Sequence, residues 1–67
     1  MLSIKLNGES REIPDAWTLA ELLKDLQINN RYCAVECNKQ LVPREQHSNH
    51  VLKADDEIEV VTLVGGG

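Results

Sequence analysis

Apolar and polar residues alternate at the start of the chain, which is the pattern of a half-buried β-strand. The apolar positions are Leu2, Ile4 and Leu6. Asn7 and Gly8 follow, and both residue types tolerate the positive φ angles of a tight hairpin turn. We expect a second strand over residues 9–13. The N-terminal segment therefore predicts a β-hairpin.

The apolar spacing then changes to that of a helix. Thr18 and Glu21 form a Thr-x-x-Glu capping box, in which each side chain bonds the backbone N–H of the other residue. Trp17 precedes the cap, where it can pack on Leu22 as a hydrophobic staple, and we assign it no further role. Apolar residues on one helical face follow at Leu19, Leu22, Leu23 and Leu26. We expect the helix to end near Gln27.

The rest of the chain predicts three more strands, at residues 32–37, 40–42 and 57–64. The last of these is the most β-prone segment of the sequence. Before it lies a polar stretch, residues 44–50, in which we expect a single helical turn and two solvated histidines, His47 and His50.

This order of elements predicts an α+β fold in which one main helix covers a mixed sheet of four to five strands. It is the β-grasp, or ubiquitin-like, arrangement, and we expect the first and last strands to lie parallel at its centre. The predicted domain covers residues 1–64, and residues 65–67 are expected to form a flexible C-terminal tail. A chain of 67 residues buries only about 60% of its unfolded surface, so there is little room for an enclosed active site. We therefore expect a protein that is not an enzyme.

The net charge of −4 argues against nucleic-acid binding, which calls for a basic surface. It favours a partner with a basic docking surface. No apolar run approaches the roughly 18 residues of a membrane span, and the N-terminus lacks the apolar core of a signal peptide. We expect a cytoplasmic protein, or one of the plastid stroma if the gene is plastid-encoded.

The two cysteines are the first candidates for chemistry. Cys33 and Cys37 lie about 13 Å apart along one strand, whereas a disulfide needs Cα atoms within about 7 Å. With His47 and His50 they give a C-x3-C and H-x2-H pattern, but these spacings are shorter than those of zinc fingers, and cysteines along a strand diverge. We therefore expect buried, unreactive cysteines, no metal and no cofactor. The alternative is a zinc- or thiol-based redox protein.

The sequence ends in three glycines, Gly65, Gly66 and Gly67. Without Cβ atoms they can adopt almost any φ and ψ and pass through a channel too narrow for other residues. A fully extended tripeptide reaches about 10 Å, far enough to enter a partner's active site. We expect Gly65 and Gly66 to thread that site and the α-carboxylate of Gly67 to react there. The alternative is a frayed end or the remainder of a longer chain.

One face of the last predicted strand changes from acidic to apolar just before the glycines. This face begins with Glu57 and Glu59 and continues with Val61 and Leu63. If this face is open to water, it carries an apolar patch beside the tail, which is typical of a docking site. We expect Val61, Leu63 and Val64 to contact the partner. The alternative is that Val61 and Leu63 fill a second small core.

Three segments together are typical of one known family: the capped leucine-rich helix, the stretch AVECNKQLVPREQ at residues 34–46 and the stretch LKADDEIEVVTLVGGG at residues 52–67. They resemble the ThiS family, the bacterial and plastid sulfur carriers of thiamine biosynthesis. The resemblance covers essentially the whole chain. Two positions depart from the family pattern: Asp55 stands where glycine is common, and His47 where tryptophan often stands. Neither departure touches the tail.

The resemblance implies that an E1-like adenylyltransferase uses ATP and Mg²⁺ to convert the carboxylate of Gly67 to an acyl-adenylate. Sulfur from a cysteine-desulfurase persulfide would then replace AMP and leave a thiocarboxylate. Thiazole synthase would use this sulfur, with a deoxyxylulose phosphate and a glycine-derived imine, to build the thiazole phosphate moiety of thiamine. All catalytic side chains would belong to these partners.

Two other functions stay open at this point. The small subunit of molybdopterin synthase shares the fold and the tail chemistry, but it is usually longer and ends in diglycine after a strand end richer in proline and aromatic residues. A non-covalent β-grasp interaction module is the other alternative. It would not gain AMP at its C-terminus when mixed with ATP and the adenylyltransferase.

Overall fold

Five strands and one α-helix form within residues 1–62, the part of the chain that the computed structural model describes. Their bounds are β1 Leu2–Leu6, β2 Glu9–Ile13, α1 Leu19–Asp25, β3 Cys33–Cys37, β4 Gln40–Leu41 and β5 Glu57–Thr62. Two 3₁₀ turns are present as well, η1 (Asn30–Tyr32) and η2 (Arg44–Gln46). Each predicted strand is found, with shifts of one residue at Tyr32 and Val42. Residues 63 and 64 of the last predicted strand lie outside the described part.

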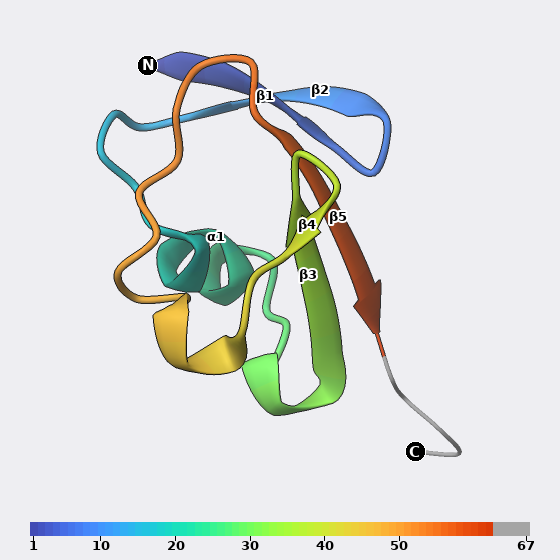
Figure 1. Ribbon diagram of the computed structural model, residues 1–67. Helices are drawn as coiled ribbons and strands as arrows, with labels where there is room; N and C mark the ends of the chain where they lie inside the picture. Colours follow the sequence, from blue (N-terminus) through green and yellow to red (C-terminus); the bar gives the residue numbers. More distant parts are fainter. Residues whose placement is uncertain (63–67) are drawn as a thin grey trace.

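The sheet has the order β2-β1-β5-β3-β4. The central strands β1 and β5 are parallel, and the other neighbouring strands are antiparallel. A parallel pair needs a long crossover connection, and the segment that contains α1 supplies it. Figure 1 shows α1 lying across one side of the sheet. This is the predicted β-grasp arrangement. Among the described residues, no helix combines the length and apolar character needed to span a bilayer.

The local signals of the sequence have the expected geometry. Asn7 and Gly8 have φ angles of 51° and 85°, so the β1–β2 turn uses the left-handed conformations that these two residue types favour. The capping box of α1 is also present. The Thr18 hydroxyl accepts the N–H of Glu21 at 3.2 Å, and the Glu21 carboxylate accepts the N–H of Thr18 at 2.9 Å.

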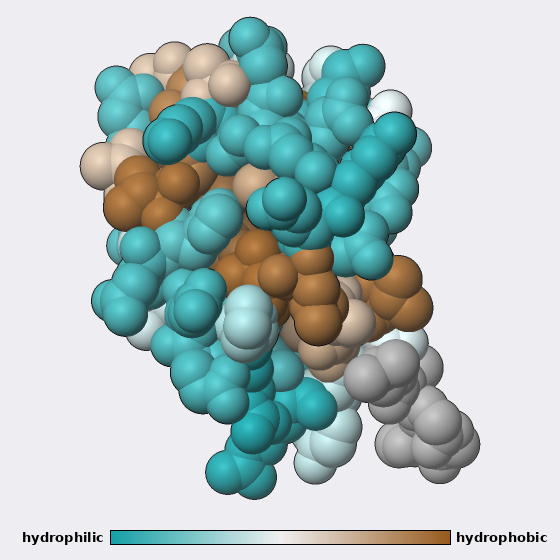
Figure 2. Space-filling model, in the orientation of Figure 1, coloured by the Kyte–Doolittle hydropathy of each residue, from teal (hydrophilic) through white to brown (hydrophobic). Residues whose placement is uncertain are grey.

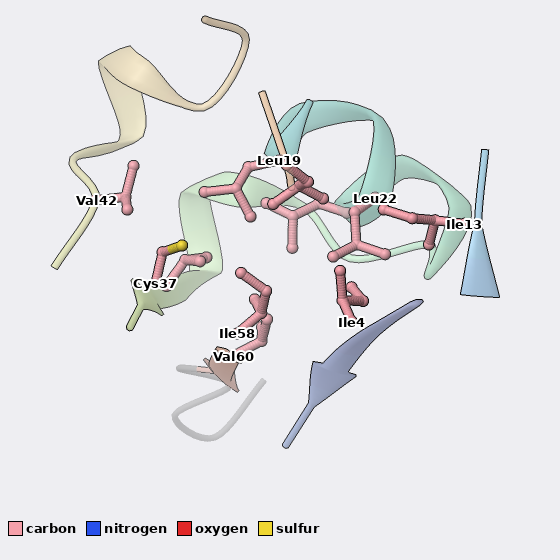
Figure 3. Close-up of a cluster of buried hydrophobic side chains, with 11 residues drawn as sticks. Ile4, Ile13, Leu19, Leu22, Cys37, Val42, Ile58 and Val60 are labelled. Atoms are coloured by element: carbon pink, nitrogen blue, oxygen red, sulfur yellow. The ribbon is translucent and has the colours of Figure 1, made fainter. Parts of the chain in front are cut away.

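One hydrophobic core fills the space between α1 and the sheet (Figure 3). The helix contributes its leucine stripe, and the sheet contributes alternate residues from four strands. The core residues are Ile4, Ile13, Leu19, Leu22, Leu23, Val35, Cys37, Val42, Leu52, Ile58 and Val60. The helical and the strand periodicities of the sequence therefore converge on the same interior, and the opposite face of the sheet is left to solvent.

The loop before β5 lies against the N-terminus of α1. Its carbonyl groups accept first-turn N–H groups of the helix, His50 from Leu19 and His47 from Ala20, both at 3.0 Å. The His47 side chain is 2% exposed, with Nε2 at 3.0 Å from the carbonyl oxygen of Val42. Because that oxygen can only accept, Nε2 donates, and Nδ1 has no partner among residues 1–62. The prediction of a solvated His47 is therefore wrong: the polar loop caps the helix, and this ring is buried in the process.

Candidate functional site

β5 is the strand that precedes the predicted reactive residues in the sequence. It pairs with β3 along five residues, but with β1 only as far as Ile58. Beyond that point the side chain of Asn7 takes the place of β1. Its amide accepts the Val60 N–H at 2.8 Å and donates to the Val60 carbonyl oxygen at 3.3 Å. β5 is therefore held on both sides until shortly before Thr62, its last residue.

Of the residues predicted to act in the site, the structure describes Val61. The others lie outside the described residues: Leu63, Val64, Gly65, Gly66 and Gly67. Val61 is 59% exposed, on the face of the sheet that α1 does not cover. The alternative in which Val61 fills a second small core is therefore excluded.

An apolar and acidic surface surrounds Val61. Directly opposed residues of antiparallel strands share a face, and β3 places Ala34 opposite Val61 and Glu36 opposite Glu59. We call these four residues, Ala34, Glu36, Glu59 and Val61, the β5 surface. Figure 2 shows hydrophobic side chains on the molecular surface near the described end of β5. An exposed valine beside two carboxylates suits a protein partner that offers both apolar and basic groups.

The acidic part continues toward the beginning of β5. A depression of about 540 Å³ lies there, lined mainly by charged side chains: Lys5, Glu36, Lys39, Glu57 and Glu59. Three carboxylates and two ammonium groups give this region a net negative charge. It adds to the negative field in front of the sheet, which accelerates encounter with a positively charged partner.

Tyr32 is a site residue that the sequence did not reveal. It is 57% exposed and, with Ile28 and Thr62, lines a smaller depression of about 210 Å³. The reason for its position is the register of β3 and β5, in which Cys33 is opposite Thr62. The residue before Cys33 therefore comes to lie beside the end of β5. The alternation pattern predicts Tyr32 as the first residue of the strand. It does not predict that Tyr32 lies beside the end of β5, because that position depends on the pairing of the two strands.

Both cysteines lie on the same strand, as predicted, but only Cys37 has the predicted burial. Within residues 1–62, Cys33 and Cys37 are both free thiols, the first half-buried and the second 6% exposed. Burial raises the pKa of the Cys33 thiol above its ordinary value. For Cys37, burial raises the pKa most; the charge of Asp56 and a hydrogen bond with it raise it further, against a smaller opposing effect of Lys53. Both thiols are therefore protonated at neutral pH, and a protonated thiol is a poor nucleophile.

Comparisons with known proteins agree with this geometry. The sequence model of the ThiS family matches residues 4–67. The chain is 30% identical over 66 residues to the sulfur carrier protein ThiS of Escherichia coli, covering 98% of this chain and 100% of that protein. It is 42% identical over 66 residues to a thiazole synthase of Magnetococcus marinus, but spans only 20% of that protein's length.

A solved structure supports the same relationship. The crystal structure of the thiamine biosynthesis protein ThiS from Geobacter metallireducens superposes with a TM-score of 0.84 at 26% sequence identity. The match covers 98% of this chain and 100% of the other.

Proposed function

The chain belongs to the ThiS family, and from this premise we propose that it is a sulfur carrier protein for the thiazole moiety of thiamine. In this proposal the carboxyl group of Gly67 is the carrier group. Gly65 and Gly66 thread the active sites of the partners. The chain is a co-substrate and not a catalyst.

The chemistry follows from the poor reactivity of a carboxylate. Its charge repels nucleophiles, and oxide is a poor leaving group. An E1-like adenylyltransferase with ATP and Mg²⁺ joins the carboxylate to AMP and releases pyrophosphate. A persulfide supplied through a cysteine desulfurase then attacks the acyl carbon, AMP leaves, and reductive cleavage of the S–S bond yields the thiocarboxylate. Thiazole synthase consumes that sulfur. ATP and Mg²⁺ are substrates and ligands of the partner, so this chain needs no cofactor of its own.

The observation that carries the proposal is the family match over residues 4–67, which includes β5 and the glycines that follow it. The similarity to part of a protein named thiazole synthase supports thiazole synthase as a partner. The protonated thiols of half-buried Cys33 and buried Cys37 support a carrier atom other than cysteine sulfur. We propose the cytoplasm, or a plastid stroma, as the compartment in which these partners meet the chain.

The β5 surface supports a docking role next to the tail. A flexible tail finds an active site faster when the adjoining surface holds the domain in place, because docking raises the effective concentration of the tail at that site. Val61 supplies an exposed apolar anchor, and Glu36 and Glu59 supply charge. We propose that Leu63 and Val64 extend this contact toward the tail.

Intact-mass measurement tests the proposal. The protein is incubated with ATP, Mg²⁺, the adenylyltransferase, a cysteine desulfurase, cysteine and a thiol reductant. We expect first an AMP adduct and then a mass gain equal to the difference between sulfur and oxygen. A variant with one residue added after Gly67 is the control and should show neither product. If wild type forms no AMP adduct, or if the extended variant forms it equally well, the assignment of Gly67 is wrong.

The choice of pathway needs a second readout. The thiocarboxylate form is offered to thiazole synthase and, separately, to the large subunit of molybdopterin synthase. We expect sulfur loss only with thiazole synthase, measured as return to the original mass. Transfer to the molybdopterin enzyme instead would place the protein in the other pathway.

A further inference from the structure

Three side chains with metal-binding atoms converge at the end of the molecule where β5 begins. The Cys37 thiol, the His50 ring and the Asp56 carboxylate each offer one ligand atom, and these atoms all lie within 4.8 Å of one another. Cys37 ends β3, whereas His50 and Asp56 both belong to the loop that precedes β5. The Cys/His pattern of the sequence does not predict a zinc site, because Cys33 diverges from Cys37 along the strand. In the folded protein, Asp56 lies beside Cys37 and His50, and Cys33 and His47 are not part of the cluster.

Hydrogen bonds fix two of these residues next to each other. Asn38, in the β3–β4 turn, donates its backbone N–H to Glu57 at 2.8 Å and its side-chain N–H to Asp56 at 3.1 Å. The Asp56 carboxylate also accepts the Lys53 N–H at 2.9 Å. Each carboxylate oxygen has two lone pairs, so two remain beyond these bonds. The Cys37 thiol donates to one of the two and releases it when the thiol loses its proton. These partners orient the carboxylate in the way that outer-shell groups orient metal ligands.

The third residue is also held in place. The backbone carbonyl of His50 accepts the N–H of Leu19 at 3.0 Å, which fixes the loop against α1. The His50 ring itself makes no hydrogen bond within residues 1–62 and is half-buried. A ring nitrogen beside a thiol and a carboxylate, with no competing partner in the described chain, is free to act as a ligand.

We propose that Cys37, His50 and Asp56 form a binding site for a zinc-class divalent cation, with a fourth position left to water. Zinc takes thiolate, imidazole and carboxylate ligands at about 2.0–2.3 Å in a tetrahedron, which puts ligand atoms about 3.4–3.6 Å apart. Separations within 4.8 Å reach that geometry through small side-chain rotations. On binding, the Cys37 thiol transfers its proton to solvent and its sulfur bonds the metal.

The surroundings allow a cation to enter. The three ligands line a pocket of about 170 Å³ that opens to solvent, together with Lys53 and Gln40. The metal-bound state would hold one thiolate and one carboxylate against the single ammonium group of Lys53. Before the cation arrives, the Cys37 thiol is neutral and the charge of Asp56 is balanced by that of Lys53, whose ammonium group repels the incoming cation. Replacing Lys53 should therefore tighten binding.

The site is independent of the proposed sulfur chemistry. Asp56 and Thr62 stand at opposite ends of β5, which at about 3.3 Å per residue puts them about 20 Å apart. A metal here therefore lies far from Thr62, the last described residue. It would instead tie the β3–β4 turn (Figure 1) to the start of β5 and to the loop that caps α1. Binding to the folded state alone raises its stability by mass action.

Cobalt provides the test, because Co²⁺ takes zinc sites and a cobalt–thiolate bond gives a charge-transfer absorption band. Metal-free, reduced full-length protein is titrated with Co²⁺ and then with Zn²⁺, which should displace the cobalt. We expect the band in wild type and in Cys33→Ser, the matched control cysteine. The band should disappear in Cys37→Ser. Affinity should fall by about tenfold or more in His50→Gln, and it should rise in Lys53→Gln.

Thermal melts with and without Zn²⁺ complete the test and report on folding. His50→Gln is the decisive variant, because its side chain bonds nothing in the described chain and the variant should fold normally. Zn²⁺ should raise the melting temperature of wild type and of Cys33→Ser, but not that of His50→Gln. Absence of the cobalt band in folded wild type would overturn the proposal. So would a band that persists in Cys37→Ser or titrates with the same midpoint in His50→Gln. None of these outcomes bears on thiocarboxylate formation at Gly67.

Discussion

Glu36 and Glu59 stand directly opposite each other on β3 and β5, on the face of the sheet that α1 leaves uncovered. Like charges in directly opposed positions destabilise a sheet. Neither carboxylate forms an ion pair within residues 1–62. The next pair on this face toward the end of β5 is Ala34 and Val61, which is apolar, with Ala34 half-buried and Val61 exposed. The repulsion between Glu36 and Glu59 lowers the stability of the free domain, but a basic partner that docks beside Val61 would relieve it. This combination is expected of a binding surface for a basic partner.

The first prediction separates stability from binding at this pair. Glu59→Gln should raise the free energy of unfolding by about 0.2–1 kcal/mol, because it removes the repulsion with Glu36. It should also slow association with the adenylyltransferase and make it less sensitive to salt. Urea unfolding and binding kinetics at two salt concentrations measure both effects. The control is Glu12→Gln. Glu12 is on β2, opposite Ser3, on the same face of the sheet, and its substitution should change neither the stability nor the association rate. Unchanged association in Glu59→Gln would remove this carboxylate from the docking surface.

The second prediction concerns the contact between Asn7 and Val60. Asn7→Gly keeps a residue that accepts a positive φ angle but removes both side-chain hydrogen bonds, and it should cost about 1–2 kcal/mol of stability. Asn7→Ala should cost about 1 kcal/mol more, because alanine is strained in the left-handed conformation. Hydrogen exchange at the Val60 amide should accelerate in both variants. Equal stabilities for wild type and Asn7→Gly would show that Asn7 contributes to stability through its turn conformation alone and not through its side-chain hydrogen bonds.

Local patterns determined most of the fold. The alternation around Ile4, the capping box at Thr18 and the leucine stripe predicted elements that the structure contains. They could do so because each depends on residues within about one helical turn or strand. The parallel pairing of β1 and β5 followed because one helix must cover one face of the sheet.

Contacts between distant segments were not predictable in the same way. The burial of His47 depends on a loop carbonyl that meets the N–H of Ala20, and the sequence places these residues 27 positions apart. The meeting of Cys37 and Asp56 depends on the hydrogen bonds of Asn38 to Asp56 and to Glu57 at the start of β5. For the candidate site, Val61 was predicted from the change along its strand. Tyr32 and Glu36 were missed because their place beside β5 is set by strand register.

The third prediction concerns the width of the tail. In Gly66→Val the domain should fold normally, with the melting temperature of wild type, because we predict that the tail lies outside the hydrophobic core. A β-branched side chain restricts φ and ψ and widens the tail, so adenylation by the partner should be strongly reduced. The rate of AMP-adduct formation at saturating ATP measures this. Gly66→Ala is the graded control and should lie between wild type and Gly66→Val. Equal rates for all three proteins would contradict the narrow-channel argument.

The fourth prediction separates the thiols from the carrier group. With metal removed, Cys37→Ala should lower stability by about 1–2 kcal/mol, because the side chain is buried in the core. Cys33→Ala should cost less, since Cys33 is only half-buried. Both variants should still accumulate the thiocarboxylate when incubated with the adenylyltransferase and the desulfurase, as measured by intact mass. Loss of the thiocarboxylate in a folded variant would show that a thiol takes part in the transfer.

The last prediction tests where the domain docks. Val61 and Leu41 are both exposed apolar residues on the uncovered face, 59% and 66% exposed. They lie on opposite sides of β3, with Val61 of β5 opposite Ala34 and Leu41 of β4 opposite Glu36. Val61→Asp should weaken binding to the adenylyltransferase and to thiazole synthase by about tenfold or more, because a central apolar anchor carries a large share of interface energy. Leu41→Asp introduces the same charge on the same face and should have little effect. Neither change should lower the melting temperature much, since neither side chain is in the core.

Titration of each partner with both variants, and with Leu63→Asp, decides how far the docking surface extends. Equal losses of affinity for Val61→Asp and Leu41→Asp would mean that the partner repels added negative charge anywhere on this face. Val61 would then not be a specific anchor. A loss confined to Val61→Asp and Leu63→Asp would instead identify an anchor next to the tail. That result is expected if docking acts by raising the concentration of the tail at the partner's active site, because the benefit is largest when the anchor and the tail are adjacent along the chain.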